Sequence, residues 1–468
     1  MVFSTLEFLF FFLPIVIIGY IAIKPSLANS WLLLCSLMFY YWGDRNHFLL
    51  LITVIGIAYF AGLLIQTFSQ MVIKRIVMCL SVFAMIAIMG YYKYWNFMIS
   101  NINKFLRQDL PMRDIVFPVG ISFFVFQAIS YVADVYRGKK ALVNPIDMAL
   151  YISFFPQLIA GPIVRFCDIR QYMGEEHRHL KIENFENGIW RFCIGLSKKV
   201  LLANNLGGLV AIVFAVQDIS QFSVLYTWLG AIAYTFQIYF DFSGYSDMAI
   251  GLGRVFGFQF QENFNYPYMA KSVKDFWRRW HISLSQFFRD YIYIPLGGNR
   301  CSKIRWIFNM MIVWVLTGLW HGAAWHYILW GIFYGCILIL KGLLPIEKKA
   351  GVLASTIQHI FTALIIISLW VLFRADGVLQ AVAFLKNMYG IGSGSFIDHA
   401  FVFQIRNFVN LLIISLIFSF PIVPYLEKKL QGSKIFRTTE TLCLMLCTLS
   451  AISYIYMGSY NPFLYFMF

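Results

Sequence analysis

The stretch FLLLITVIGIAYFAGLLI, residues 48–65, decides the fold class. It holds no charged side chain, and a helix of this length would extend about 27 Å, close to the hydrocarbon thickness of a bilayer. Other stretches are mostly apolar and near the same length: 6–23, 76–89, 115–132, 356–373 and 408–422. The sequence therefore predicts an all-α polytopic membrane protein with roughly eleven transmembrane helices.

The composition agrees with a membrane protein. Of 468 residues, 60% are hydrophobic and only 13% are charged, which leaves too little polar surface to cover a soluble body of this size. The first apolar run follows no basic residue and precedes no small-residue cleavage pattern, so we expect a retained helix. No internal repeat or long polar linker divides the sequence, which predicts one membrane domain over residues 1–468 and weighs against a transporter with duplicated halves.

The formal net charge of +15 is spread over short loops between apolar segments. The positive-inside rule explains this distribution better than nucleic-acid binding, which we do not expect. Within 271–305, only Asp275 and Asp290 oppose eight basic residues, Lys271, Lys274, Arg278, Arg279, Arg289, Arg300, Lys303 and Arg305. We therefore expect this interval to face the cytoplasm.

The eight cysteines are scattered, mostly within apolar runs, and none forms a CxxC pair. We predict that they are buried small hydrophobic residues. No HExxH motif is present, and His326 lies five residues after His321, so the two rings would point in different directions on a helix. We expect no metal site and no tightly bound cofactor.

The stretch YFDFSGYSDMAIGLGRVFGF, residues 239–258, places Asp241, Tyr245 and Asp247 at the mouth of an apolar run. Carboxylates within a membrane are functional candidates, and here they would line a cavity or orient a histidine. They can equally bond loop backbone or pair with arginines. We favour the structural interpretation, and both remain open.

A second polar stretch, KDFWRRWHISLSQFFRDYIYIPLGGNR, spans residues 274–300. It predicts an amphipathic interfacial helix with an Asp275–Arg279 ion pair. One face of that helix would carry Trp277, Trp280, His281 and Leu284. Pro295 and the following glycines should end the helix, so we expect a re-entrant or interfacial element buried in protein.

The stretch LTGLWHGAAWH, residues 316–326, interrupts another apolar run. On one helix Trp314, Gly318, His321 and Trp325 would form a stripe, and the spacing of Gly318 and Gly322 lets a neighbouring helix approach closely. An imidazole in such surroundings needs either a structural hydrogen bond or a chemical role. For an isolated histidine in such a run, the residues alone favour the structural role, a hydrogen bond to a carbonyl, and leave a chemical role open.

Several motifs together resemble the membrane-bound O-acyltransferase family, in particular its bacterial branch of alginate and peptidoglycan O-acetyltransferase subunits. DFWRRWHISLSQFFRDYIYIPLGG and LTGLWHGAAWH carry the resemblance. Further matches are FPVGISFFVFQAISYVADVYRG (117–138), FFPQLIAGPIVR (154–165), YFDFSGYSDMAIGLGRVFGF (239–258) and LWVLFRADGVLQAVAFLKNMYG (369–390). The similarity covers most of the chain, and its motifs are specific in combination.

The resemblance implies a ring of tilted helices around a central tunnel, with re-entrant and interfacial helices. It maps a catalytic histidine onto His321 and a second functional histidine onto His281, and leaves His326 with a core role. Candidates that line the tunnel or orient substrate are Asp241, Tyr245, Asp247, Trp277 and Trp320. Imidazole suits acyl transfer because it accepts a proton near neutral pH.

The resemblance also implies substrates, partners and location. The donor would be acetyl-CoA or a similar cytoplasmic thioester. The acceptor would be a polysaccharide, reached through a periplasmic SGNH-type acetyltransferase or similar partner. The protein would lie among the lipids of the bacterial cytoplasmic membrane. Two alternatives are D-alanyl transfer to teichoic acid from a carrier-protein thioester and a channel or transporter without acyl chemistry.

The basic interval yields a topology prediction. Single cysteines in place of Lys271 or Lys303 should react with a membrane-impermeant thiol reagent only from the cytoplasmic side, because arginine and lysine are retained there. Labelling in intact cells and in inverted vesicles measures this. Labelling of either position from the outer side would overturn the assignment.

Overall fold

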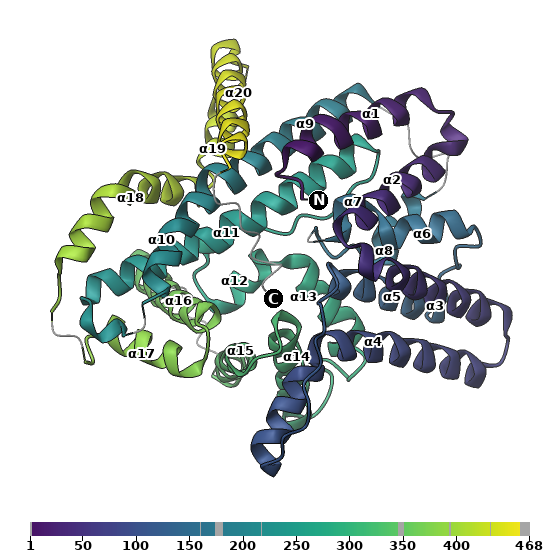
Figure 1. Cartoon of the computed structure of the whole chain (residues 1–468), viewed down its shortest axis with the longest axis horizontal. Coiled ribbons are helices and arrows are strands. Elements are labelled where there is room, and N and C mark those ends of the chain that lie inside the picture. The colour runs from purple at the N-terminus through teal and green to yellow at the C-terminus, as the bar shows by residue number, and fades with distance from the viewer. Residues whose placement is uncertain are drawn as a thin grey trace. The chain divides into compact units, whose positions relative to one another are not determined.

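The computed structural model describes residues 2–159, 161–173, 181–216, 218–344, 351–392, 395–430 and 432–458. Across these ranges the regular secondary structure is entirely helical (Figure 1). Seven helical segments are long and apolar enough to cross a membrane: Arg45–Thr67, Met71–Leu106, Ile182–Phe214, Trp325–Leu343, Val352–Arg374, His399–Phe418 and Lys434–Tyr456. The predicted polytopic helical class is confirmed, whereas the expected number of eleven is not.

The chain forms two compact units, each described here by itself. The first comprises Met1–Phe192, Tyr245–Glu262 and Arg289–Tyr291, and the second comprises Cys193–Gly244, Asn263–Phe288 and Ile292–Phe468. Two helices, α9 (Ile182–Ser197) and α11 (Val224–Val255), contribute residues to both units. The single membrane domain expected from the sequence stays a prediction.

The first unit is built on closely packed helices. Its elements are η1 (Phe8–Phe12), α1 (Leu13–Ala22), α2 (Ala28–Gly43), α3 (Phe48–Thr67), α4 (Met71–Leu106), α5 (Ile121–Tyr136), α6 (Pro145–Ser153), α7 (Phe155–Leu158) and α8 (Phe166–Ile169). Helix α3 packs against both α4 and α5. Gly62 makes this packing possible, since a Cβ atom there would lie 2.4 Å from the Tyr131 hydroxyl.

The apolar run 115–132 forms helix only from Ile121 onward. Gly120 precedes the helix with φ of 72°, in the left-handed region, and Pro118 lies just before it. Such a backbone is disfavoured for residues with a Cβ atom and cannot continue an α-helix backwards. The predicted helix over 115–132 therefore begins too early, because the residues up to Gly120 are not helical.

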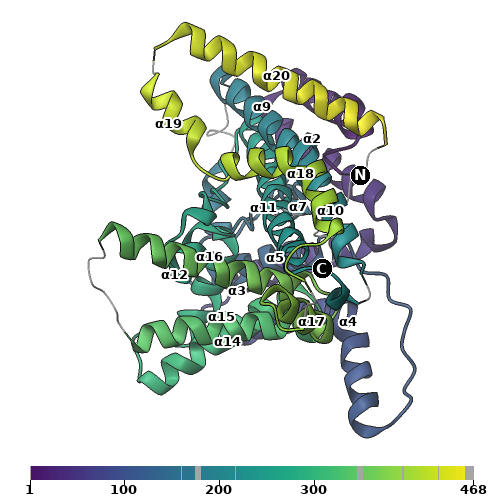
Figure 2. The same ribbon diagram turned by 90° about the vertical axis from the view of Figure 1, so that its left-hand side faces the viewer.

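The second unit contains most of the remaining helices. They are η6 (Lys198–Asn204), α10 (Asn205–Phe214), α12 (Val273–Arg279), α13 (Ile282–Phe288), α14 (Lys303–His321), α15 (Trp325–Leu343), α16 (Val352–Arg374), α17 (Val378–Met388), α18 (His399–Phe418), α19 (Ile422–Lys429) and α20 (Lys434–Tyr456). Helices α14 and α15 form a hairpin and lie side by side in Figure 1 and in Figure 2. The π-helix η9 (Arg289–Tyr293) crosses the boundary between the units.

The sequence predicted two helical faces, one from Trp277 to Leu284 and one from Trp314 to Trp325. Both predictions are wrong, because each helix ends before the last residue of its predicted face. Helix α12 stops at Arg279, and His281 adopts a positive φ of 44°, so Trp277 and His281 do not share one helical face. Helix α14 stops at His321, where Gly322 is extended, so Trp325 lies on the next helix. The expected pair of Asp275 with Arg279 is present at 3.2 Å.

The prediction that the cysteines are buried is also wrong. All eight are free, only Cys35 is buried, and five are exposed: Cys79, Cys167, Cys336, Cys443 and Cys447. Most of the exposed ones lie on membrane-length helices. A small apolar side chain costs little on a lipid-facing surface, so an apolar sequence context does not require burial in protein.

The glycines of the α14–α15 hairpin generate a stability prediction. A Cβ atom at Gly318 would lie 2.4 Å from the Tyr327 carbonyl oxygen, and one at Gly322 would lie 2.3 Å from the Tyr327 ring. Gly318→Leu or Gly322→Leu should therefore push the helices apart and lower the yield and thermal stability of folded protein in detergent.

The matched control is Gly208→Leu in α10, because a Cβ atom at Gly208 meets no heavy atom within 4 Å. This variant should fold in near-normal yield. Equal yields for Gly318→Leu and Gly208→Leu would show that close helix packing at Gly318 does not matter for folding.

Candidate active site

His281 is held in an unusual backbone conformation between two short helices. It is fully buried with φ of 44°, a region that few non-glycine residues adopt. Two backbone hydrogen bonds hold the surrounding segment: the Asn265 N–H donates to the Arg279 carbonyl at 2.9 Å, and the Ile282 N–H donates to the Asn263 carbonyl at 3.0 Å. Neighbouring structure thus supplies the support that a strained residue requires.

The side chain of Asn263 completes this support. Its Oδ1 atom lies 3.1 Å from His281 Nδ1, and it accepts hydrogen bonds from the Ser283 N–H at 3.2 Å and the Ser283 hydroxyl at 2.9 Å. Burial lowers the pKa of His281 to about 3, because a charged imidazolium would lose its hydration there. His281 is therefore neutral. The sequence did not single out Asn263. Its only visible feature was that it is polar and precedes the RRWHISL motif.

Aromatic rings connect His281 to His321. The His281 ring lies 4.6 Å from Phe242 at 90° and 5.5 Å from Trp320, measured between ring centroids. Trp320 also lies 4.8 Å from the His321 ring. One indole thus contacts both imidazoles, and the structure brings together three of the residues that the sequence selected.

His321 ends α14 and is buried among aromatic side chains of α15 and α16. Its ring lies 5.1 Å from Trp330 and 4.9 Å from Phe373, with edge-to-face geometry at both. Trp277, the remaining tryptophan candidate, lies one ring further away, 5.6 Å from Trp330. These rings shield the His321 imidazole from water.

Asp241 has a buried cationic partner. Lys199 Nζ forms a salt bridge with it, both side chains are almost fully buried, and Lys199 also donates to Asn204 Oδ1 at 2.9 Å. The two helical segments that carry Lys199 and Asp241 approach closely at Gly244, which has no side chain. A Cβ atom there would lie 2.8 Å from the Gly195 carbonyl oxygen. Lys199 was missed because a lysine next to an apolar run resembles an ordinary flanking charge.

Tyr245 and Asp247 belong to the first unit. The Tyr245 ring stacks on Phe3 at 4.6 Å. Asp247 accepts from Arg191 at 2.7 Å, and Arg191 also contacts Glu262. Asp241 and Asp247 thus each have a basic partner, as the structural interpretation of these carboxylates requires, while a role in substrate binding stays a prediction.

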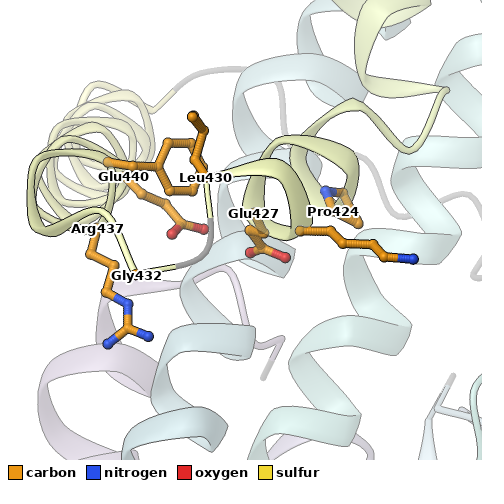
Figure 3. A pocket seen from close by; sticks show the side chains of 8 residues that line it. Pro424, Glu427, Leu430, Gly432, Arg437 and Glu440 are labelled. Carbon is orange, nitrogen blue, oxygen red and sulfur yellow. The ribbon is translucent and has the colours of Figure 1, made fainter.

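A hollow of about 400 Å³ lies between α19 and α20. Figure 3 shows Glu427 on the first of these helices and Arg437 and Glu440 on the second, and Lys428 also lines the space. Carboxylates and cations balance each other there, and no histidine lines the hollow. It holds none of the histidines that the sequence motifs single out, so the histidine pair is the stronger candidate site.

An imidazole that is buried among aromatic rings, as His321 is, is suited to proton transfer. Among the described residues, no three His, Cys, Asp or Glu side chains gather in a group that would hold a metal ion. His326 packs on Tyr327 at 4.0 Å between ring centroids. The arrangement supports general-base chemistry at His321, with His281 as a neutral neighbour.

Comparisons with known proteins agree with these motifs. Residues 58–372 match the sequence model of the membrane-bound O-acyltransferase family, MBOAT. The chain is 41% identical over 399 residues to the probable alginate O-acetylase AlgI of Pseudomonas aeruginosa, a match that covers 84% of this chain and 76% of the relative.

Two other relatives differ in their named activity. The chain is 35% identical over 428 residues to the peptidoglycan O-acetyltransferase of Helicobacter pylori, with 84% of this chain and 81% of the relative covered. It is 28% identical over 353 residues to the teichoic acid D-alanyltransferase of Bacillus subtilis, with 71% and 86% covered. The similarity is therefore higher to the O-acetyltransferase than to the D-alanyltransferase.

The buried pair of Lys199 with Asp241 yields a stability prediction. Lys199→Met should destabilise the protein by about 3–5 kcal/mol, because it leaves a buried carboxylate without its partner. Replacing both residues, Lys199→Met with Asp241→Leu, should recover much of that loss. Thermal unfolding of the purified variants measures both effects.

Asp376→Asn is the control, since Asp376 is 80% exposed and lies 3.5 Å from Arg374. It should change the unfolding temperature little. A Lys199→Met variant as stable as this control would show that the buried pair does not hold the two segments together.

Proposed function

The chain belongs to the membrane-bound O-acyltransferase family, and we propose that it transfers acetyl groups from a cytoplasmic thioester for O-acetylation of an exported or cell-surface polysaccharide. It is an O-acyltransferase and a multi-pass membrane protein. The observation that supports its site is the contact of one indole, Trp320, with both His281 and His321.

His321 is the proposed base. It takes the proton of the acceptor hydroxyl as the oxygen forms a bond to the thioester carbonyl carbon. The carbon–sulfur bond then breaks, and the proton passes from His321 to the leaving thiolate, which restores the neutral imidazole. The aromatic rings around His321 exclude water that would compete for the acyl group.

The relatives support a polysaccharide as the final acceptor. Their names specify alginate and peptidoglycan, whose hydroxyls are chemically similar acceptors. We propose a periplasmic SGNH-type acetyltransferase as the partner that receives or directs the acetyl group, and a location in the bacterial inner membrane. Acetyl-CoA is the proposed donor, used as a substrate and not as a resident cofactor.

D-Alanyl transfer to teichoic acid is the second candidate, because a D-alanyltransferase is 28% identical to this chain. The O-acetyltransferases are more similar, at 41% and 35% identity, which favours acetyl transfer. Supplying purified protein with acetyl-CoA or with a D-alanyl carrier-protein thioester separates the two donors directly.

His321→Ala should lower acyl transfer by about 10²-fold or more, the scale of losing a general base. Expression and membrane insertion should stay nearly normal, because the variant changes one side chain at the end of α14. Release of free thiol from the thioester, measured with acceptor present in reconstituted vesicles, reports the rate.

His326→Ala provides the control, since His326 is a buried neighbour that packs on Tyr327. It should reduce thermal stability more than transfer. Near-normal transfer by His321→Ala would contradict the proposed base.

A further inference from the structure

The hydrogen bonds around Asn263 determine the orientation of its side-chain amide. The backbone N–H of Ser283 reaches the Oδ1 position of Asn263 at 3.2 Å. A backbone N–H can only donate, so the atom that it reaches must be the amide oxygen and not the amide nitrogen. The reversed amide would place two donors against each other.

This orientation in turn determines the tautomer of His281. Its Nδ1 atom lies 3.1 Å from the same Asn263 oxygen, and an oxygen in this position accepts but does not donate. The hydrogen must therefore be on Nδ1, and the neutral ring carries its lone pair on Nε2. The tautomer follows from the hydrogen bonds themselves, because the Ser283 backbone N–H fixes the Asn263 oxygen and that oxygen fixes the hydrogen on His281.

The Nε2 atom is buried and has no hydrogen-bond partner within the part of the chain that the structure describes. A buried acceptor without a partner is rare in native proteins and calls for an explanation. The positive φ of His281 is a second unusual feature at the same residue. Strain and an unsatisfied buried atom often occur together at functional sites.

We propose that Asn263 is a positioning residue that holds His281 as the Nδ1–H tautomer, so that Nε2 accepts a hydrogen bond from an N–H or O–H group of a substrate. This inference rests on the proposed acyl transfer and deepens it. With its lone pair on Nε2, His281 offers no N–H there to an oxyanion, so it acts as an acceptor.

Two substrate groups have the required chemistry. One is the amide N–H nearest the sulfur in the arm of a CoA or carrier-protein thioester, which His281 would hold in place. The other is a hydroxyl of the acceptor sugar next to the reacting one, which would donate a hydrogen bond to Nε2 and so place the reacting hydroxyl for His321. Kinetics distinguish these two sources.

The most direct test is solid-state NMR of the full-length protein in lipid bilayers, with ¹⁵N-labelled histidine. Subtracting the spectrum of His281→Gln identifies the His281 ring signals. We expect a protonated Nδ1 and an unprotonated Nε2 in the unsubstituted protein, and loss of this pattern in Asn263→Ala. A protonated Nε2 in the unsubstituted protein would overturn the proposal.

A kinetic test uses Asn263→Ala and Asn263→Asp. Asn263→Ala should lower kcat/KM by about tenfold or more, the scale of one lost hydrogen bond. Asn263→Asp buries a negative charge and should be less stable, but it keeps an accepting oxygen, so each folded molecule should retain more activity than Asn263→Ala. A higher KM for the donor with unchanged kcat would identify the amide N–H, and a lower kcat with unchanged donor KM would identify the hydroxyl.

Asn387→Ala is the matched control. Asn387 is a buried asparagine of the same unit that donates to Ile219 O at 3.0 Å, Phe222 O at 3.1 Å and Thr227 Oγ1 at 2.7 Å. It should lower stability but leave transfer per folded molecule unchanged.

The outcomes separate this inference from the proposed function. Normal kcat and KM for folded Asn263→Ala would overturn the positioning role while leaving acyl transfer intact. Absence of thioester-dependent transfer by the unsubstituted protein would instead overturn the proposed function. The NMR pattern of the unsubstituted protein decides the tautomer even if Asn263→Ala folds poorly, because the assignment needs only His281→Gln.

Discussion

Backbone amides and carbonyls inside a bilayer have no water to bind, and the rest of this structure depends on that constraint. Helices satisfy these groups internally, which is why the described regular structure is entirely helical. Where a helix must end, the chain has to provide other partners. At His281 the partners come from the segment around Asn263, through backbone bonds to Ile282 and side-chain bonds to Ser283. The interruption of the helix at His281 is therefore stabilised by both backbone and side-chain hydrogen bonds.

The same constraint applies to charge. Asp241 pairs with Lys199, and Asp247 pairs with Arg191. A buried carboxylate without such a partner would be costly. His281 avoids this cost differently, because burial keeps its imidazole neutral. The buried carboxylates thus have cationic partners, whereas the two histidines lie among aromatic rings.

Much of this could be predicted from the sequence, because apolar length and motif identity are local properties. The run 48–65, the Asp275–Arg279 pair and the family assignment all follow from neighbouring residues. The break at His281 was not predictable in this way. It depends on hydrogen bonds to Asn263, which lies 18 residues earlier, so helical periodicity wrongly extended α12. Lys199 was missed for a similar reason, since only the close approach at Gly244 reveals its partner. The exposed cysteines were misassigned because an apolar context does not distinguish lipid from protein interior.

The central claim is that acyl transfer takes place at the aromatic cluster containing His321 and His281. An experimental structure of the protein with a non-hydrolysable acetyl-CoA analogue tests it most directly. The account predicts the carbonyl carbon of the analogue beside His321, with an open approach for an acceptor oxygen at about 3–3.5 Å. A well-ordered analogue bound elsewhere, such as the hollow between α19 and α20, with His321 facing lipid would contradict it.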